Sequence, residues 1–348
     1  ISHENLTVYP IYANKQVDTS QLLTLQEAME QKLVTVHETG TVNTLSISVE
    51  GDVKVYIQAG DVVKGGKQDR AIGYDMIVCK ADGKVPLNAF CVEQGRWQKR
   101  GQEAVGQFKE SKNYVMGNDL KSAIRDSFVE QQQQQEQQND NQELNEQSED
   151  QSIPQTQVLN GLNQELTNNF LAIGSSNSAT STMFAGRSNG QSAVWNQVSS
   201  NQSKVLSNSS LKAEDLESGS SLQLTMEHTK TQEAIQGYEK AFSDLFQNDK
   251  EMVGFAFAIN GQLNSAELYC SNDLFTRMAK KLLQSAATEA LTLKGKKSTV
   301  DHSAEDVEAW INKPADYKKQ YDKNDNIMYN KGRERCYDSH YNFDKTSD

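Results

Sequence analysis

Two short polar stretches hold the residues whose types and spacing could do chemistry. The first reads GDVVKGGKQDR at residues 60–70, and the second reads CVEQGRW at residues 91–97. Hydrolysis by acid–base catalysis needs two facing carboxyl groups, one that donates a proton and one that accepts it. Asp69 and Glu93 are the pair that these stretches supply, so they are the candidate catalytic residues if the protein is a hydrolase.

The same stretches could instead hold a ligand or stabilise the fold. Arg70 and Arg96 carry planar guanidinium groups that bind the oxygen atoms of an anion or a sugar, and Trp97 could form the apolar wall of such a pocket. Alternatively, the charges form ion pairs between neighbouring strands and lock a sheet edge. We favour the structural interpretation, and expect Glu93 to pair with Arg70 or Lys67, with Trp97 close by. The candidate set for either role is Lys67, Gln68, Asp69, Arg70, Glu93, Arg96, Trp97 and Trp195.

Other site chemistries have less support. The glycines at residues 65–66 are not a phosphate loop, because that motif runs from a strand into a helix and here a strand follows. The five histidines lie far apart in the sequence, and there is no G-x-S-x-G elbow. The cysteines show no metal-ligand spacing, so we expect no metal and no nucleotide cofactor. They are Cys79, Cys91, Cys270 and Cys336.

The composition limits the classes of binding partner and indicates the cellular location. The net charge of −12 argues against nucleic acid or an anionic membrane as a partner, and no apolar run is long enough to span a bilayer. Four cysteines allow two disulfides if the protein is secreted, and buried thiols are the equal alternative. The first residue is Ile1, not Met, and glycosylation sequons begin at Asn5, Asn201 and Asn208. These features favour secretion.

Hydrophobic periodicity predicts a mostly antiparallel sheet in the first hundred residues. Apolar residues alternate at 45–49 and 53–57, and the turn Glu50-Gly51-Asp52 separates these two strands. Further strands are predicted at 5–12, 71–79 and 87–92. Thr24 and Glu27 have the spacing of a capping box, which predicts a short helix.

The second half of the chain completes the same domain. Helices are predicted at residues 230–247, 272–291 and 303–314, and Asn260-Gly261 predicts a hairpin over residues 253–268. The expected fold is α+β, a mostly antiparallel sheet packed by a few long helices. Residues 1–128 and 190–312 form the domain; a Gln/Asn/Ser-rich insert, helical or disordered, occupies 129–189, and a polar tail occupies 313–348.

Several of these stretches resemble a known family when taken in order. They are NLTVYPIY, GDVVKGGKQDR, CVEQGRW, QSAVW and VGFAFAINGQLNSAELYCSNDLFTRMAKKLLQSAATEA. Together they resemble the ARG and rhodanese-phosphatase-superfamily-associated protein domain over most of residues 5–128 and 190–291, leaving out the Gln-rich insert. The resemblance implies a β-rich α+β domain, common in secreted or envelope bacterial proteins, and it brings no established activity.

Two functional hypotheses follow. The first is a secreted, non-enzymatic binding or self-assembly protein, whose partner is another copy of the chain, in an oligomer or a filament, or a glycan or small anionic ligand. The second is a hydrolase built around Asp69 and Glu93. We favour the first, because the sequence shows no nucleophile–base arrangement and because polar segments such as residues 130–152 and 315–348 need a further surface to order them.

Overall fold

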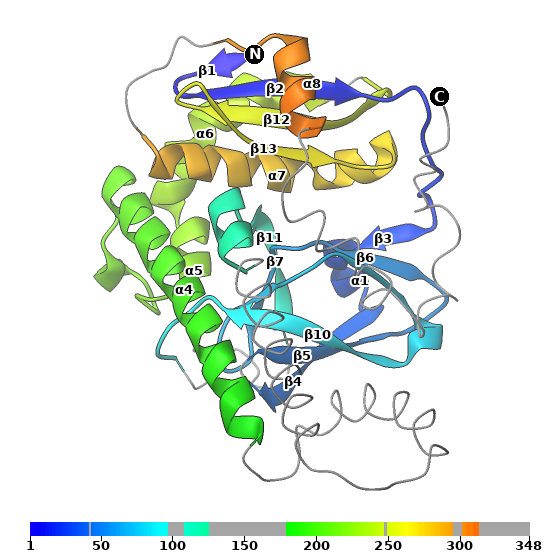
Figure 1. Ribbon diagram of the computed structural model, residues 1–348, viewed down its shortest axis with the longest axis vertical. Helices are drawn as coiled ribbons and strands as arrows, with labels where there is room; N and C mark the ends of the chain where they lie inside the picture. Colours follow the sequence, from blue (N-terminus) through cyan, green and yellow to red (C-terminus); the bar gives the residue numbers. More distant parts are fainter. Residues whose placement is uncertain (42, 97–107, 125–178, 247–248, 295–300, 313–348) are drawn as a thin grey trace, which may run out of the picture. The chain divides into compact units, whose positions relative to one another are not determined.

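The computed structural model describes residues 1–41, 43–96, 108–124, 179–246, 249–294 and 301–312 (Figure 1). The chain divides into two compact units, one of residues 1–121 and 194–348 and the other of residues 122–193. All the described strands belong to the first unit. Much of the second unit, including most of the predicted Gln-rich insert, lies outside the described residues, as does the tail 313–348.

A four-stranded antiparallel sheet joins the start of the chain to its later part. Its order is β1 (Ser2–His3), β2 (Leu6–Tyr12), β12 (Met252–Ile259) and β13 (Gln262–Leu268). The hairpin predicted at Asn260-Gly261 is confirmed, with positive φ at both residues (53° and 75°), as a type I′ turn requires. The predicted first strand pairs with this hairpin, so segments about 250 residues apart form one sheet.

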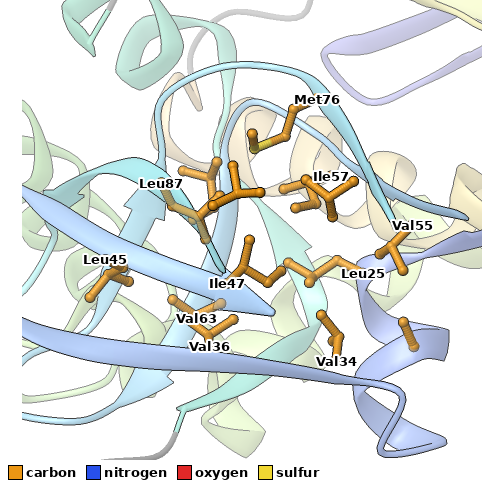
Figure 2. Packing of buried hydrophobic residues seen from close by; sticks show 14 of the residues in the cluster. Leu25, Val34, Val36, Leu45, Ile47, Val55, Ile57, Val63, Met76 and Leu87 are labelled. Atoms are coloured by element: carbon orange, nitrogen blue, oxygen red, sulfur yellow. The ribbon is translucent and has the colours of Figure 1, made fainter. Parts of the chain in front are cut away.

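The remaining strands form two further sheets. The six-stranded sheet is antiparallel in the order β11 (Phe108–Val115), β7 (Asp61–Gly65), β8 (Arg70–Ile72), β10 (Lys84–Cys91), β5 (Thr44–Val49) and β4 (Val34–Thr41). The three-stranded sheet has the order β3 (Leu22–Thr24), β6 (Lys54–Ile57) and β9 (Met76–Cys79), with β3 and β6 parallel. Apolar side chains from both sheets meet in one core, which includes Ile47, Val55, Ile57 and Leu87 (Figure 2).

The α+β class is confirmed, but the expectation of one continuous sheet is wrong. The turn at residues 50–52 joins strands of different sheets, because β5 pairs with β4 and β10 whereas β6 pairs with β3 and β9. The strand predicted at 71–79 is broken into β8 and β9, and at the break Asp75 accepts a hydrogen bond from the backbone N–H of Ala59 (2.7 Å). Apolar alternation reports burial of one face, not the identity of the neighbouring strand.

Helices cover the sheets as the periodicity predicts. Thr24 and Glu27 cap α1 (Leu25–Glu30) reciprocally, so the predicted capping box is confirmed. α6 (Thr229–Phe242) continues into the 3₁₀ turn η3 (Ser243–Phe246), and Ser271 caps α7 (Asn272–Thr292). α7 packs against β12 and also against β11, so it links the four-stranded sheet to the six-stranded one (Figure 1). The other described helices are the 3₁₀ turns η1 (Lys80–Asp82) and η2 (Ala213–Asp215), the α-helices α4 (Ala179–Asn208), α5 (Leu222–Glu227) and α8 (Ala304–Asn312), and residues 118–124.

Candidate functional site

The tight turn between β7 and β8 brings the polar residues together. Gly65 and Gly66 both have positive φ (120° and 52°), a conformation that glycine adopts at little cost. A Cβ atom on Gly66 would also collide with the ring of Phe108 on β11. Glycine is therefore required at this turn for its conformation and for its small size.

Asp69 follows this turn and is completely buried. Its Oδ1 atom accepts hydrogen bonds from the backbone N–H of Gly65 (3.1 Å) and from the guanidinium group of Arg96 (3.5 Å). Its Oδ2 atom accepts one from the hydroxyl group of Ser221 (2.9 Å). Both carboxylate oxygens of Asp69 thus have donors from the protein itself.

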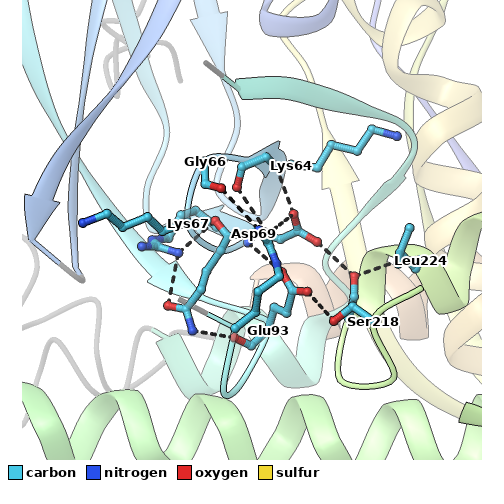
Figure 3. A network of polar contacts seen from close by, with 12 residues as sticks. Lys64, Gly66, Lys67, Asp69, Glu93, Ser218 and Leu224 are labelled. Atoms are coloured by element: carbon cyan, nitrogen blue, oxygen red, sulfur yellow. Dashed lines mark hydrogen bonds and ion pairs between the residues drawn. The ribbon is translucent and has the colours of Figure 1, made fainter. Parts of the chain in front are cut away.

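Glu93 lies just after β10 and is also completely buried. Its Oε1 atom accepts a short hydrogen bond from the hydroxyl group of Ser218 (2.6 Å). Its Oε2 atom accepts from the backbone N–H of Asp69 (3.2 Å) and from Arg96, at 2.7 Å to Nε and 2.7 Å to NH2. Glu93 is therefore the centre of a network that Figure 3 shows from close by.

Arg96 forms ion pairs with both carboxylates, and a second arginine, Arg70, is buried in the same stretch. Arg96, with a side chain 8% exposed, also donates to the carbonyl oxygens of Gly66 (3.2 Å) and Gly65 (3.3 Å). Arg70 is completely buried and donates to the carbonyl oxygen of Gln68 (2.9 Å). A buried charge is tolerated when opposite charges and hydrogen bonds surround it. The guanidinium group of Arg96, which faces both carboxylates, meets that condition.

The network corrects the predicted pairing. Glu93 forms its ion pair with Arg96, three residues further along the chain, where we expected Arg70 or Lys67. The backbone N–H of Lys67 donates to Glu38 (3.4 Å). Trp97 lies outside the described residues. The turn after β10 explains the difference, because it directs the Arg96 guanidinium group back onto the carboxylates and the glycine turn.

The side chain of Gln68 joins this network to Cys91. The Gln68 amide donates to the carbonyl oxygen of Glu93 (2.8 Å), and the thiol of Cys91 donates to the amide oxygen of Gln68 (3.0 Å). Burial raises the pKa of the Cys91 thiol to about 11, so the reactive thiolate form is disfavoured near neutral pH. This cysteine has a packing role in the site.

Sequence reasoning missed the two serines that complete the network. Ser218 and Ser221 lie in a serine-rich stretch, and a serine hydroxyl group leaves no periodic signal in a sequence. The only available hint was the apolar residue Leu222 directly after them, since Ser before an apolar run is a helix N-cap signal. The hydroxyl group of Ser221 does cap α5, accepting from the backbone N–H of Leu224 (3.1 Å).

Trp195 is separate from the bonds described above. It lies on α4, is partly buried, and its indole nitrogen has no hydrogen-bond partner among the described residues. The stretch QSAVW that contains it forms part of this helix, which begins at Ala179. No described contact joins Trp195 to Asp69 or Glu93.

The side-chain amides of the three sequon asparagines form hydrogen bonds within the fold, and this argues against glycosylation at these positions. Asn5 and Asn201 are buried (7% and 6% exposed), and their amide groups donate to the carbonyl oxygen of Ala290 (3.0 Å) and to Asp119 (2.7 Å). Asn208 donates to the carbonyl oxygen of Leu291 (2.7 Å). A sugar on any of these nitrogens would require the folded contacts to break.

The described cysteines include both a disulfide-bonded residue and thiols, the two alternatives that the sequence leaves open. Cys79 takes part in a disulfide bond, whereas Cys91 and Cys270 carry thiols. Of the two alternatives, the thiol therefore applies to Cys91 and Cys270. The thiol of Cys91 is buried and hydrogen-bonded to Gln68. Cys336 lies outside the described residues.

Two other buried charged groups lie on α7. Lys281 pairs with Asp61 at the start of β7 (2.7 Å), and both side chains are nearly inaccessible (5% and 2% exposed). Glu289 accepts hydrogen bonds from the side chain of Asn264 (3.0 Å) and the backbone of Asn118 (3.2 Å). Burial raises the pKa of Glu289 to about 7, and the nearby charge of Asp119 adds to the effect.

Within the described ranges, no group of His, Cys, Asp or Glu side chains has an arrangement that would hold a metal ion. Likewise, no helix in the described part of the chain combines the length and apolar character needed to cross a membrane. The Asp69–Glu93 cluster joins the β7–β8 turn, the end of β10 and the start of α5 through buried hydrogen bonds and an ion pair.

Comparison with known proteins identifies the family. No curated protein and no solved structure matches the chain. A family model does match, and its range of residues 1–343 includes the segment 129–189 that the sequence resemblance left out. The chain belongs to the family described as the ARG and Rhodanese-Phosphatase-superfamily-associated Protein domain.

Proposed function

We propose that the protein is a secreted, non-enzymatic protein that associates with further copies of itself. The edge of the four-stranded sheet at β13 carries this proposal, and the state of Asp69 and Glu93 argues against the hydrolase alternative. Both carboxylates are completely buried, and all four oxygens accept hydrogen bonds from the protein. A general acid or base must reach the proton that it transfers, so the closed site does not support the hydrolase alternative.

The edge of the four-stranded sheet supports self-association. β13 is the last strand in the described order, and its sequence QLNSAEL contains neither proline nor lysine, two residues that commonly protect an edge. Its one charged residue, Glu267, is occupied by an ion pair with Lys121 (2.6 Å). At its end Leu268 is 49% exposed. The pairing of β13 with β12 shifts register at Asn264, whose carbonyl oxygen accepts a hydrogen bond from Asn118 (3.0 Å). A strand from another chain would therefore add through backbone hydrogen bonds to the part of β13 beyond this irregularity.

The geometry favours another copy of this chain as the occupant. Two copies of β13 can pair in antiparallel fashion about a two-fold axis, which would make one continuous sheet from two four-stranded ones. The disulfide at Cys79 supports an oxidising compartment, because disulfides persist chiefly outside the reducing cytosol. A filament would need a second, different contact in addition to this one.

Sedimentation velocity of two matched variants tests the proposal. Leu268→Lys places a charge at the end of the β13 edge, and Leu293→Lys places one at a residue of similar exposure (40%) that follows α7. We expect the native protein and Leu293→Lys to sediment as species larger than 38.8 kDa, and Leu268→Lys to shift toward the monomer.

A native protein that remains a 38.8 kDa monomer at every concentration would contradict self-association. Equal association by both variants would show that the β13 edge is not the contact.

A further inference from the structure

Residues 217–221 form a short segment over the buried carboxylates, which we call the serine strap. Its sequence is Glu-Ser-Gly-Ser-Ser, and it connects the 3₁₀ turn η2 to α5. Ser218 donates to Oε1 of Glu93 (2.6 Å) and Ser221 donates to Oδ2 of Asp69 (2.9 Å). The strap therefore supplies one donor to each carboxylate of the cluster (Figure 3).

The strap is attached by hydrogen bonds. Besides the two bonds to carboxylates, Ser220 donates to the carbonyl oxygen of Gln94 (2.7 Å), and the amide of Gln202 on α4 donates to the carbonyl oxygens of Gly219 (3.0 Å) and Ser221 (3.1 Å). A β-bridge between Glu93 and Ser221 completes the attachment.

The strap carries no apolar side chain, unlike the neighbouring strands β8 and β10. Glu217 and Gly219 are exposed on its outer side, and the buried apolar contact resumes only at Leu222, which is 2% exposed. Opening the strap would break hydrogen bonds but expose little apolar surface, which is the property of a segment that opens locally while the core stays folded. Opening β8 or β10 would instead expose the apolar core.

We propose that the serine strap opens as a unit and controls the access of solvent to Asp69 and Glu93. When it opens, Oδ2 of Asp69 and Oε1 of Glu93 lose their serine donors together, next to the guanidinium group of Arg96. When it closes, the two hydroxyl groups restore the sealed cluster. This inference goes beyond self-association and does not depend on it, since it concerns a different surface of the chain.

Carboxyl labelling of the full-length protein tests the strap. The protein is treated with a water-soluble carbodiimide and glycinamide, and the labelling rate of each carboxylate is followed by peptide mass spectrometry. In Ser218→Ala the strap loses a hydrogen bond to a charged acceptor, so we expect Asp69 and Glu93 both to be labelled about tenfold faster than in the native protein. Asp61, which is 2% exposed and lies outside the cluster, is expected to keep its native rate.

Ser220→Ala is the matched variant within the strap. Its hydroxyl group bonds to a neutral carbonyl oxygen, so we expect an increase of at most about threefold. Three results would overturn the proposal: unchanged labelling in Ser218→Ala, an increase at Glu93 without one at Asp69, or a parallel increase at Asp61. The last result would mean that the whole chain unfolds and that the strap has no opening of its own.

Discussion

At the residue scale, the negative charge of Glu93 compensates the positive charge of the buried guanidinium group of Arg96. Glu93→Gln keeps the shape of the side chain but removes its charge, so that among the described ion pairs of Arg96 the more distant one with Asp69 (3.5 Å) would remain. Removing one partner of a buried ion pair costs about 3–5 kcal/mol of unfolding free energy, and we expect a loss in this range. Urea unfolding measures it.

The control for Glu93→Gln is the same substitution at Glu214, which pairs with Lys212 on the surface (3.2 Å, side chains 74% and 73% exposed). Exposed pairs contribute little, so Glu214→Gln should leave the urea midpoint unchanged. If Glu93→Gln also leaves it unchanged, the cluster is not a structural lock, and its charges would need a functional explanation.

Glu289 gives a second prediction at this scale, on the dependence of stability on pH. Its pKa is raised from 4.5 to about 7 in the folded chain, so between these values the folded state holds a proton that the unfolded state releases. The stabilisation is complete below pH 4.5 and is lost as the pH rises through 7, by about 3 kcal/mol. Glu289→Gln cannot lose a proton.

Urea unfolding of both proteins at pH 5 and pH 8 measures this effect as a difference. We expect Glu289→Gln to be more stable than the native protein at pH 8, and the advantage to disappear at pH 5, because Gln resembles the protonated acid. The same difference in stability at both values would show that Glu289 does not titrate in this range.

The site could be predicted from the sequence only in part, and for a physical reason. The charged residues of 67–70 and 93–96 were recognisable because a run of charges is unusual next to strands. Their partners were not, since Glu93 pairs with Arg96 through the shape of a turn. Ser218 and Ser221 lie more than 120 residues away from Glu93, and nothing in a serine-rich stretch indicates which carboxylate its hydroxyl groups will meet.

At the element scale, the β7–β8 turn depends on Gly66 in two ways. Gly66→Ala would place a side chain at positive φ (52°) and against the ring of Phe108. We expect a loss of more than about 2 kcal/mol of unfolding free energy, because the conformational cost of about 1 kcal/mol is joined by the collision. Thermal or urea unfolding measures the loss.

Gly40→Ala separates the two contributions in the same assay. Gly40 also has a positive φ (80°), but a Cβ atom there would have nothing within 4 Å. It should therefore show the conformational cost alone. Equal losses at Gly40 and Gly66 would mean that Phe108 moves aside and that the collision contributes nothing.

The elements themselves could be predicted better than their arrangement. Strong local sequence signals correctly predicted their elements. Examples are the capping box of α1, the Asn260-Gly261 turn and the apolar stripe of α7. The division into three sheets could not be predicted, because β5 and β6 both carry apolar residues at every second position and this spacing does not indicate which strand each pairs with. The bounds of α4 could not be predicted because its serines and asparagines are weak helix formers, and packing of its later residues decides its structure.

At the scale of the whole molecule, the account rests on what covers the β13 edge. The four-stranded sheet ends at β13 in the described residues, and the proposal places a second copy of β13 there. The backbone N–H groups on that edge would then be protected from solvent only while two chains are associated. Protection of this strand should therefore depend on protein concentration.

Amide hydrogen exchange of residues 262–268, at a high and a low protein concentration, tests this claim most directly. The account predicts that amides of β13 exchange more slowly at the high concentration, while those of β12, which is flanked by β2 and β13, exchange at the same rate in both samples. Equal exchange of β13 at the two concentrations, in a range where the mass also stays at 38.8 kDa, would contradict it.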